Sequence, residues 1–145
     1  MITEVRATAA EAVYAVRGVE AAALFVPLGA RGVNVDMIIQ VAPEIVFSAP
    51  REDRQTVASV LDALGADWSE RVDVGRVTII GVGLKTHPDV VAMVFRRLGE
   101  LAVAPEFVST SPIKMAFYVP ETELERTTGD LRALLLAQPA ETPDS

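Results

Sequence analysis

The chain has 145 residues, half of them hydrophobic, and a formal net charge of −7. That length suits one ordinary domain or two very small ones that share a core. The acidic balance disfavours nucleic acid as a partner, because phosphate binding needs clustered Lys and Arg. With no cysteine and a single histidine, His87, disulfides, thiolate sites and multi-histidine metal sites are excluded. No apolar run approaches the roughly 18 residues of a membrane helix, and the N-terminus lacks a signal-peptide core, so we expect a cytoplasmic protein with no membrane partner.

In the first half of the chain, the apolar pattern predicts a strand, a helix, two strands and a second helix. They cover residues 12–16, 20–31, 33–41, 44–48 and 51–64. Pro27 falls inside the first helix and is expected to kink or break it. The opening stretch 2–7 and the connector 66–74 are each expected to supply a further strand, the opening stretch to the second half.

The second half has the same order of elements. A strand over 76–80 is followed by a helix from about 87, hairpin strands over 103–109 and 113–119, and a helix from 120. Pro88 suits the first helical turn, where its missing N–H costs nothing. Strand, helix, strand, strand, helix is the ferredoxin-like order without its last strand. We therefore predict an α/β (α+β) fold of tandem ferredoxin-like βαββα units, with antiparallel sheets and helices on one face.

The two halves also match residue by residue at a shift of 70 positions. The matched pairs are Phe25/Phe95, Leu28/Leu98, Gly29/Gly99, Val33/Val103, Asp36/Glu106, Phe47/Phe117, Pro50/Pro120, Leu61/Leu131 and Leu64/Leu134. Matches this regular indicate an internal duplication. The four phenylalanines are accordingly expected in the core.

The copies differ in the connection between the first strand and the first helix. The strands match at a shift of 63 and the helices at a shift of 70, so the second copy has seven more residues there. These form the loop 82–88, whereas the first copy passes from Gly18 to Glu20 almost directly. A Gly-containing loop before a helix offers backbone N–H groups and a positive dipole end, which suits a ligand carboxylate.

Three motifs resemble the tandem ACT domains of the aspartokinase regulatory region. Residues 76–88, RVTIIGVGLKTHP, are similar to that family's VSxVGxGMxSHPGV; 108–114, VSTSPIK, to its ISTSEIKI hairpin; and 32–40, GVNVDMIIQ, to its GINIDMIxQ strand. The resemblance runs from about residue 5 to 136. It implies one ACT unit over 1–73, whose N-terminal strand can complete the second unit, another over 74–137, and a disordered tail over 138–145.

The resemblance also implies a homodimer, and an amino-acid effector of the lysine or threonine type. The effector would bind between the loop of one unit and the second strand of its neighbour. The residues matched to such a site are Gly83, Leu84, Lys85, Thr86, His87, Asp89, Asn34, Val35, Asp36 and Gln40. The short first loop, and Ala104 and Pro105 in place of Asn34 and Val35, leave one of the two site types degraded. We find no kinase region, and expect a regulatory chain that works with a separate kinase catalytic subunit.

Several roles stay open. His87 can contact a ligand or fix the loop, Lys85 can pair with a carboxylate or be solvated, and Asn34 and Asp36 can hold an amino group or tie strand ends at a dimer interface. Ser111 and its neighbour Thr110 are typical of a hairpin rather than a nucleophile. No catalytic residue, cofactor or metal site is expected. The alternatives to a regulator are a dimeric scaffold that has lost effector binding, and a repurposed protein that binds or converts a more apolar molecule.

Overall fold

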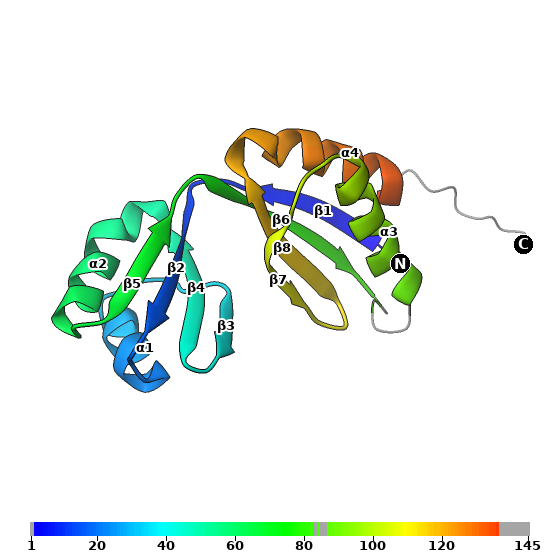
Figure 1. Cartoon of the computed structure of the whole chain (residues 1–145). Coiled ribbons are helices and arrows are strands. Elements are labelled where there is room, and N and C mark those ends of the chain that lie inside the picture. Colours follow the sequence, from blue (N-terminus) through cyan, green and yellow to red (C-terminus); the bar gives the residue numbers. More distant parts are fainter. Residues whose placement is uncertain (1, 83, 85–86, 137–145) are drawn as a thin grey trace, which may run out of the picture. The chain divides into compact units, whose positions relative to one another are not determined.

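The computed structural model describes residues 2–82, 84 and 87–136, which form two compact units (Figure 1). Residues 10–74 form one continuous unit, here called the insert unit. The other, here called the split unit, consists of residues 2–9 together with the described residues from 75 onward. The tail expected over 138–145 lies outside the described residues.

The insert unit contains the first copy and a sheet of four strands. Its elements are β2 (Glu11–Arg17), α1 (Ala21–Ala30), β3 (Ile38–Val41), β4 (Glu44–Pro50), a 3-10 turn (Arg51–Asp53), α2 (Arg54–Ala63) and β5 (Asp67–Arg71). The strand order is β3-β4-β2-β5, and all the pairings are antiparallel. The connector after the first copy thus supplies β5 to the first copy's own sheet.

The insert unit's core lies between one face of this sheet and both helices. Tyr14 of β2 and Phe47 of β4 are fully buried and stack with their ring centroids 5.1 Å apart. Leu24 and Leu28 of α1 and Val57 of α2 are fully buried in the same cluster. Alternate strand residues face these helices, as a two-layer α/β sandwich requires.

The split unit contains the second copy in the same arrangement. Its elements are β1 (Ile2–Thr8), β6 (Val74–Gly81), α3 (Pro88–Glu100), β7 (Glu106–Thr110), β8 (Lys114–Pro120), a 3-10 turn (Glu121–Glu123) and α4 (Leu124–Leu136). The strand order is β1-β6-β8-β7. β1, the opening stretch, runs antiparallel to β6 with Val5 opposite Ile79. Its core cluster includes Phe117 of β8, Leu98 of α3 and Leu131 of α4, all buried.

Backbone conformation explains where the first helix of each copy ends. Gly32 follows α1 with φ +74°, and its N–H donates to the Gly29 carbonyl. This left-handed position is a common helix terminator that favours glycine. After α3 the matching position is Ala102, which takes the same conformation with φ +59°. The two copies share this backbone geometry although the second has alanine where glycine fits best.

Two local predictions were wrong, and a third was tested in part. The strands expected over 33–41 and 103–109 begin only at Ile38 and Glu106. In the first copy the regular register begins late because two residues pair with Ser48: the Asp36 N–H donates to its carbonyl and its N–H donates to the Met37 carbonyl, each at 3.0 Å. The Met37 N–H donates to the Ser48 hydroxyl at 3.1 Å. Of the two outcomes expected at Pro27, a break does not occur, because α1 continues to Ala30.

Phe95 also departs from the expectation that all four repeated phenylalanines are core residues. Its side chain is 39% exposed on α3, whereas Val94 and Leu98 of that helix are buried. The buried stripe of α3 therefore passes beside Phe95. Phe25 is partly buried, and only Phe47 and Phe117 are fully enclosed.

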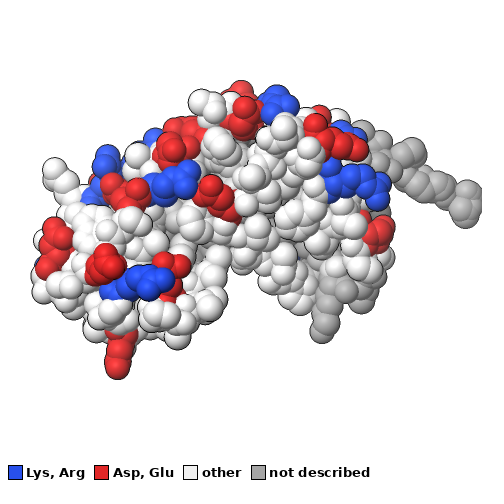
Figure 2. All heavy atoms as spheres, in the orientation of Figure 1, with Lys and Arg blue, Asp and Glu red and all other residues white. Residues whose placement is uncertain are grey.

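The surface carries mixed charge. On the face shown in Figure 2, Lys and Arg are interspersed with Asp and Glu rather than gathered into a basic patch. Neighbouring ion pairs such as Arg6–Glu4 and Arg54–Glu70, both at 2.9 Å, account for part of this mixing. Among the helices in the described part of the chain, none is long and apolar enough to cross a membrane.

Candidate ligand-binding site

The segment between β6 and α3 is held by the turn of the β7–β8 hairpin. The Gly81 N–H donates to the Ile113 carbonyl and the Leu84 N–H donates to the Pro112 carbonyl, each at 2.9 Å. These bonds place the Leu84 side chain against the core, where it is only 5% exposed. Two of the three motifs, the β6 loop and the hairpin, therefore meet in space.

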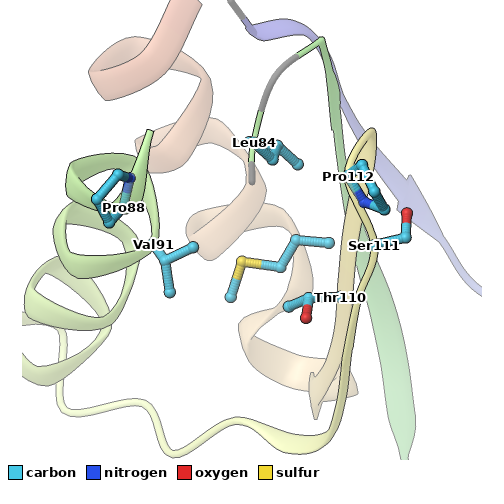
Figure 3. A pocket seen from close by; sticks show the side chains of 7 residues that line it. Leu84, Pro88, Val91, Thr110, Ser111 and Pro112 are labelled. Atoms are coloured by element: carbon cyan, nitrogen blue, oxygen red, sulfur yellow. The ribbon is translucent and has the colours of Figure 1, made fainter. Parts of the chain in front are cut away.

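A cavity of about 620 Å³ opens where they meet (Figure 3). Its lining consists of Leu84, Pro88, Val91, Thr110, Ser111, Pro112 and Met115. Pro88 and Val91 come from the start of α3 and face Thr110 and the hairpin across the cavity. The volume lies in the range of roughly 300–1,000 Å³ that small-molecule sites occupy.

The lining is apolar apart from two hydroxyl groups. The Ser111 hydroxyl belongs to the hairpin turn, because it accepts the Ile113 N–H and donates to the Lys114 carbonyl, each at 3.4 Å. Ser111 is thus a turn residue, as its sequence context indicates. Thr110 offers the remaining hydroxyl, and none of the described lining side chains is ionisable.

The residues predicted around this loop have separate positions. Leu84 lines the cavity, whereas His87 and Asp89 are exposed at the start of α3. His87 occupies the N-cap position of α3, and its carbonyl accepts the Val90 N–H, but its side chain makes no capping hydrogen bond. Gly83, Lys85 and Thr86 lie outside the described residues.

The other predicted residues belong to the insert unit. Asn34, Val35 and Asp36 lie between α1 and β3, and the Asp36 N–H donates to the Ser48 carbonyl at 3.0 Å. Asn34 and Asp36 are exposed, and Val35 packs partly against the core. Gln40 is exposed on β3. The structure thus brings the predicted residues together in two groups, one in each unit.

Gln40 lines a second cavity, of about 340 Å³, that sequence reasoning missed. The other residues of its lining are Gly18, Val19, Glu20, Ala21, Ala42 and Pro43. It lies between the β2–α1 connection and the β3–β4 turn, which is the same place in the first copy as the larger cavity in the second. The short first loop therefore narrows this site and leaves a carboxylate, Glu20, in its wall.

The clearest pKa shifts lie away from both cavities. Arg54 hydrogen-bonds to Glu70 at 2.9 and 3.0 Å and lowers the pKa of that carboxyl group. Burial, with the Glu70 carboxylate beside it, raises the pKa of Tyr14. These groups connect β2, α2 and β5 of the insert unit, so their shifts are explained by the fold.

The comparisons with known proteins agree with this arrangement. Residues 77–133 match the family described as ACT domain. A chain in a crystal structure of aspartokinase alpha and beta subunits is 30% identical, with a TM-score of 0.76 over 91% of this chain and 97% of that one. The chain belongs to the aspartokinase regulatory ACT-domain family.

Two further relatives show how this aspartokinase regulatory chain compares in length with a regulatory subunit and with a longer aspartokinase. The ligand-free regulatory subunit of aspartate kinase from Thermus thermophilus is 26% identical, with a TM-score of 0.84, over 93% of this chain and 99% of that one. The aspartokinase of Geobacillus stearothermophilus is 37% identical over 106 residues, which are 69% of this chain and 26% of the relative. The chain thus spans about a quarter of the length of such curated relatives and nearly all of the solved regulatory subunit.

Proposed function

We propose that this chain is a non-catalytic, amino-acid-responsive regulatory subunit that controls a separate aspartokinase catalytic chain. The observation that carries the proposal is the end-to-end match to a solved regulatory subunit, combined with a small-molecule cavity at the junction of the family's loop and hairpin. A regulatory subunit works beside its kinase, so the proposal keeps the expected cytoplasmic location.

The proposed effector binds at the loop of the second copy. Its carboxylate lies at the N-terminal end of α3, where the helix dipole favours negative charge, and its amino group contacts Asn34 and Asp36 of a neighbouring insert unit. The exposed position of Asn34, Asp36 and His87 is compatible with such contacts. In the first copy the Glu20 carboxylate stands in the narrower cavity and repels a ligand carboxylate, so this site type is the degraded one.

The proposed assembly is a homodimer formed through sheet edges. β3 and β7 end their sheets, and exposed edges of this kind pair readily with another strand. Both carry apolar side chains at the surface, with Ile38 51% and Val108 37% exposed. Exposed apolar residues on an edge strand favour coverage by a second copy.

Regulation follows from the packing between ACT units. An effector that contacts two units stabilises the arrangement in which both contacts form, and it can shift the equilibrium only by its differential affinity for that arrangement. The kinase chain bound to the assembly then responds to the change in population.

The test is co-expression of this chain with an aspartokinase catalytic chain, followed by affinity purification and kinase assays with a panel of amino acids. We expect co-purification, and a change in activity with at least one amino acid that also raises the melting temperature of this chain. Val108→Lys should weaken the dimer in light scattering, whereas the exposed Thr122→Lys is the matched control. A monomeric chain that neither binds an amino acid nor retains a kinase would refute the proposal. A dimer with unaltered stability across the panel would favour the scaffold.

A further inference from the structure

The floor of the larger cavity is part of the split unit's core. Met115 and Leu84 are members of the buried cluster, 1% and 5% exposed, and Val91 packs against it. Pro88 and Pro112 form the exposed rim. A ligand group that enters from the rim is therefore surrounded by carbon and sulfur atoms and loses its contact with water.

The described side chains of the lining offer no ionic partner for a charged group. The described side chains that form it are all uncharged, and the Ser111 hydroxyl is engaged within its own turn. A charged group placed on this floor would lose its hydration without an ion pair or hydrogen bond to replace it, which is strongly unfavourable. The Thr110 hydroxyl, near the mouth, is suited to a polar group that stays in contact with solvent.

From this lining we infer that the cavity is a specificity pocket for an uncharged amino acid with an apolar side chain, of the leucine or methionine kind. The inference rests on the proposed function and names the ligand class of its site. The apolar side chain fills the floor between Val91 and Met115. The α-ammonium and α-carboxylate groups remain at the mouth, beside Thr110.

The same geometry ranks the competing amino acids. A lysine side chain would bring its ammonium group to the apolar floor, and a threonine side chain is too short to fill it. A difference of one or two methylene groups in an apolar pocket corresponds to about 10-fold to 200-fold in discrimination. We expect leucine and methionine to bind at least about tenfold more tightly than threonine or lysine.

Two variants address the pocket without disturbing its backbone. Val91→Glu places a carboxylate in the half-buried wall, beside the side chain of a bound amino acid. It should improve lysine binding at least about tenfold and weaken leucine binding. Val91→Ala removes apolar contact from the wall and should weaken leucine binding about tenfold. Ala133→Glu, exposed on α4 and outside the lining, adds the same charge as a control and should change neither.

Isothermal titration of the full chain and each variant with L-leucine, L-methionine, L-threonine and L-lysine tests the inference, with circular dichroism as the check on folding. The ranking above, reversed toward lysine by Val91→Glu and not by Ala133→Glu, supports it. Tighter binding of lysine or threonine by the unaltered chain overturns it and leaves the regulatory proposal standing. Leucine binding that is insensitive to both pocket variants also overturns it. Absence of binding by any amino acid overturns both.

Discussion

Gly75 of β6 and Leu124 at the start of α4 are packed too closely to admit another atom between them. A Cβ atom built on Gly75 would lie 2.5 Å from Leu124 Cδ2 and 3.1 Å from both Cδ1 and Cγ. Leu124 is a core residue and only 5% exposed. The substitution Gly75→Ala therefore forces a buried side chain to move within a densely packed cluster.

The expected effect combines two opposing terms. Overpacking of a core costs about 1–3 kcal/mol. The φ of Gly75 lies outside the left-handed region, so alanine is compatible with the backbone and recovers about 0.4–1 kcal/mol from the unfolded chain. We expect a net loss of about 1–2 kcal/mol in the free energy of unfolding, and a melting temperature lower by roughly 5 °C.

Urea and thermal unfolding monitored by circular dichroism measure this loss, with Gly129→Ala as the matched control. Nothing lies within 4 Å of a Cβ at Gly129 on the exposed side of α4, so that change should stabilise the helix by about 0.5–1 kcal/mol. Leu124→Ala alone should cost about 2–5 kcal/mol, but less in the Gly75→Ala background, where the new methyl group fills vacated space. If Gly75→Ala matches the unaltered chain in stability, or if the two effects simply add, the packing argument is wrong.

Three further predictions concern single residues. The buried Thr127 hydroxyl has no hydrogen-bond partner within the described part of the chain. Thr127→Val should therefore leave stability unchanged or raise it by about 1 kcal/mol in urea unfolding, and a marked loss would point to a partner for it. Ala102 holds the left-handed conformation that Gly32 holds in the other copy, so Ala102→Gly should raise the melting temperature and Gly32→Ala should lower it. Arg54 lowers the pKa of Glu70 from 4.5, so this pair stabilises the fold above about pH 4.5 and the contribution is lost as the pH falls further. Stability–pH curves of the unaltered chain and Glu70→Gln should differ at pH 7 and converge in acid, and parallel curves would contradict this.

Because the chain is internally duplicated, its architecture could be predicted from the sequence. The repeat placed Phe47 and Phe117 at equivalent core positions, and both are fully buried. The family and the α/β fold with two antiparallel sheets, predicted from motifs and periodicity, are confirmed. Periodicity succeeds here because it reports which face of each element is apolar, and that face decides the layer arrangement.

Periodicity could not predict where two strands begin or which phenylalanine is exposed. The start of β3 depends on how Asp36 and Met37 both pair with Ser48, a residue of the neighbouring strand β4. Phe95 lies beside the buried stripe of α3, so its exposure depends on how far the helix is rotated against the sheet. Both features depend on tertiary contacts, which the local pattern of apolar residues does not report.

The candidate site could be predicted only in part from the sequence, because it too depends on tertiary contacts. The loop and the hairpin were identified as separate motifs, but the cavity exists because Leu84 and Pro112 are joined by a backbone hydrogen bond. The smaller cavity was missed because a shortened loop was interpreted as a lost site. Ligand binding at either position stays a prediction.

The sequence of the insert unit interrupts that of the split unit, so the folding of the split unit depends on that of the insert unit. β1 pairs with β6 although residues 10–74 separate the two halves of the split unit, and closing so long a loop from an unfolded chain carries a substantial entropy cost. The folded insert unit removes that cost, because β2 and β5 are paired, with Val13 opposite Arg71 near the two points where the chain enters and leaves. Loss of structure in the insert unit should therefore loosen β1 from β6 through chain connectivity alone.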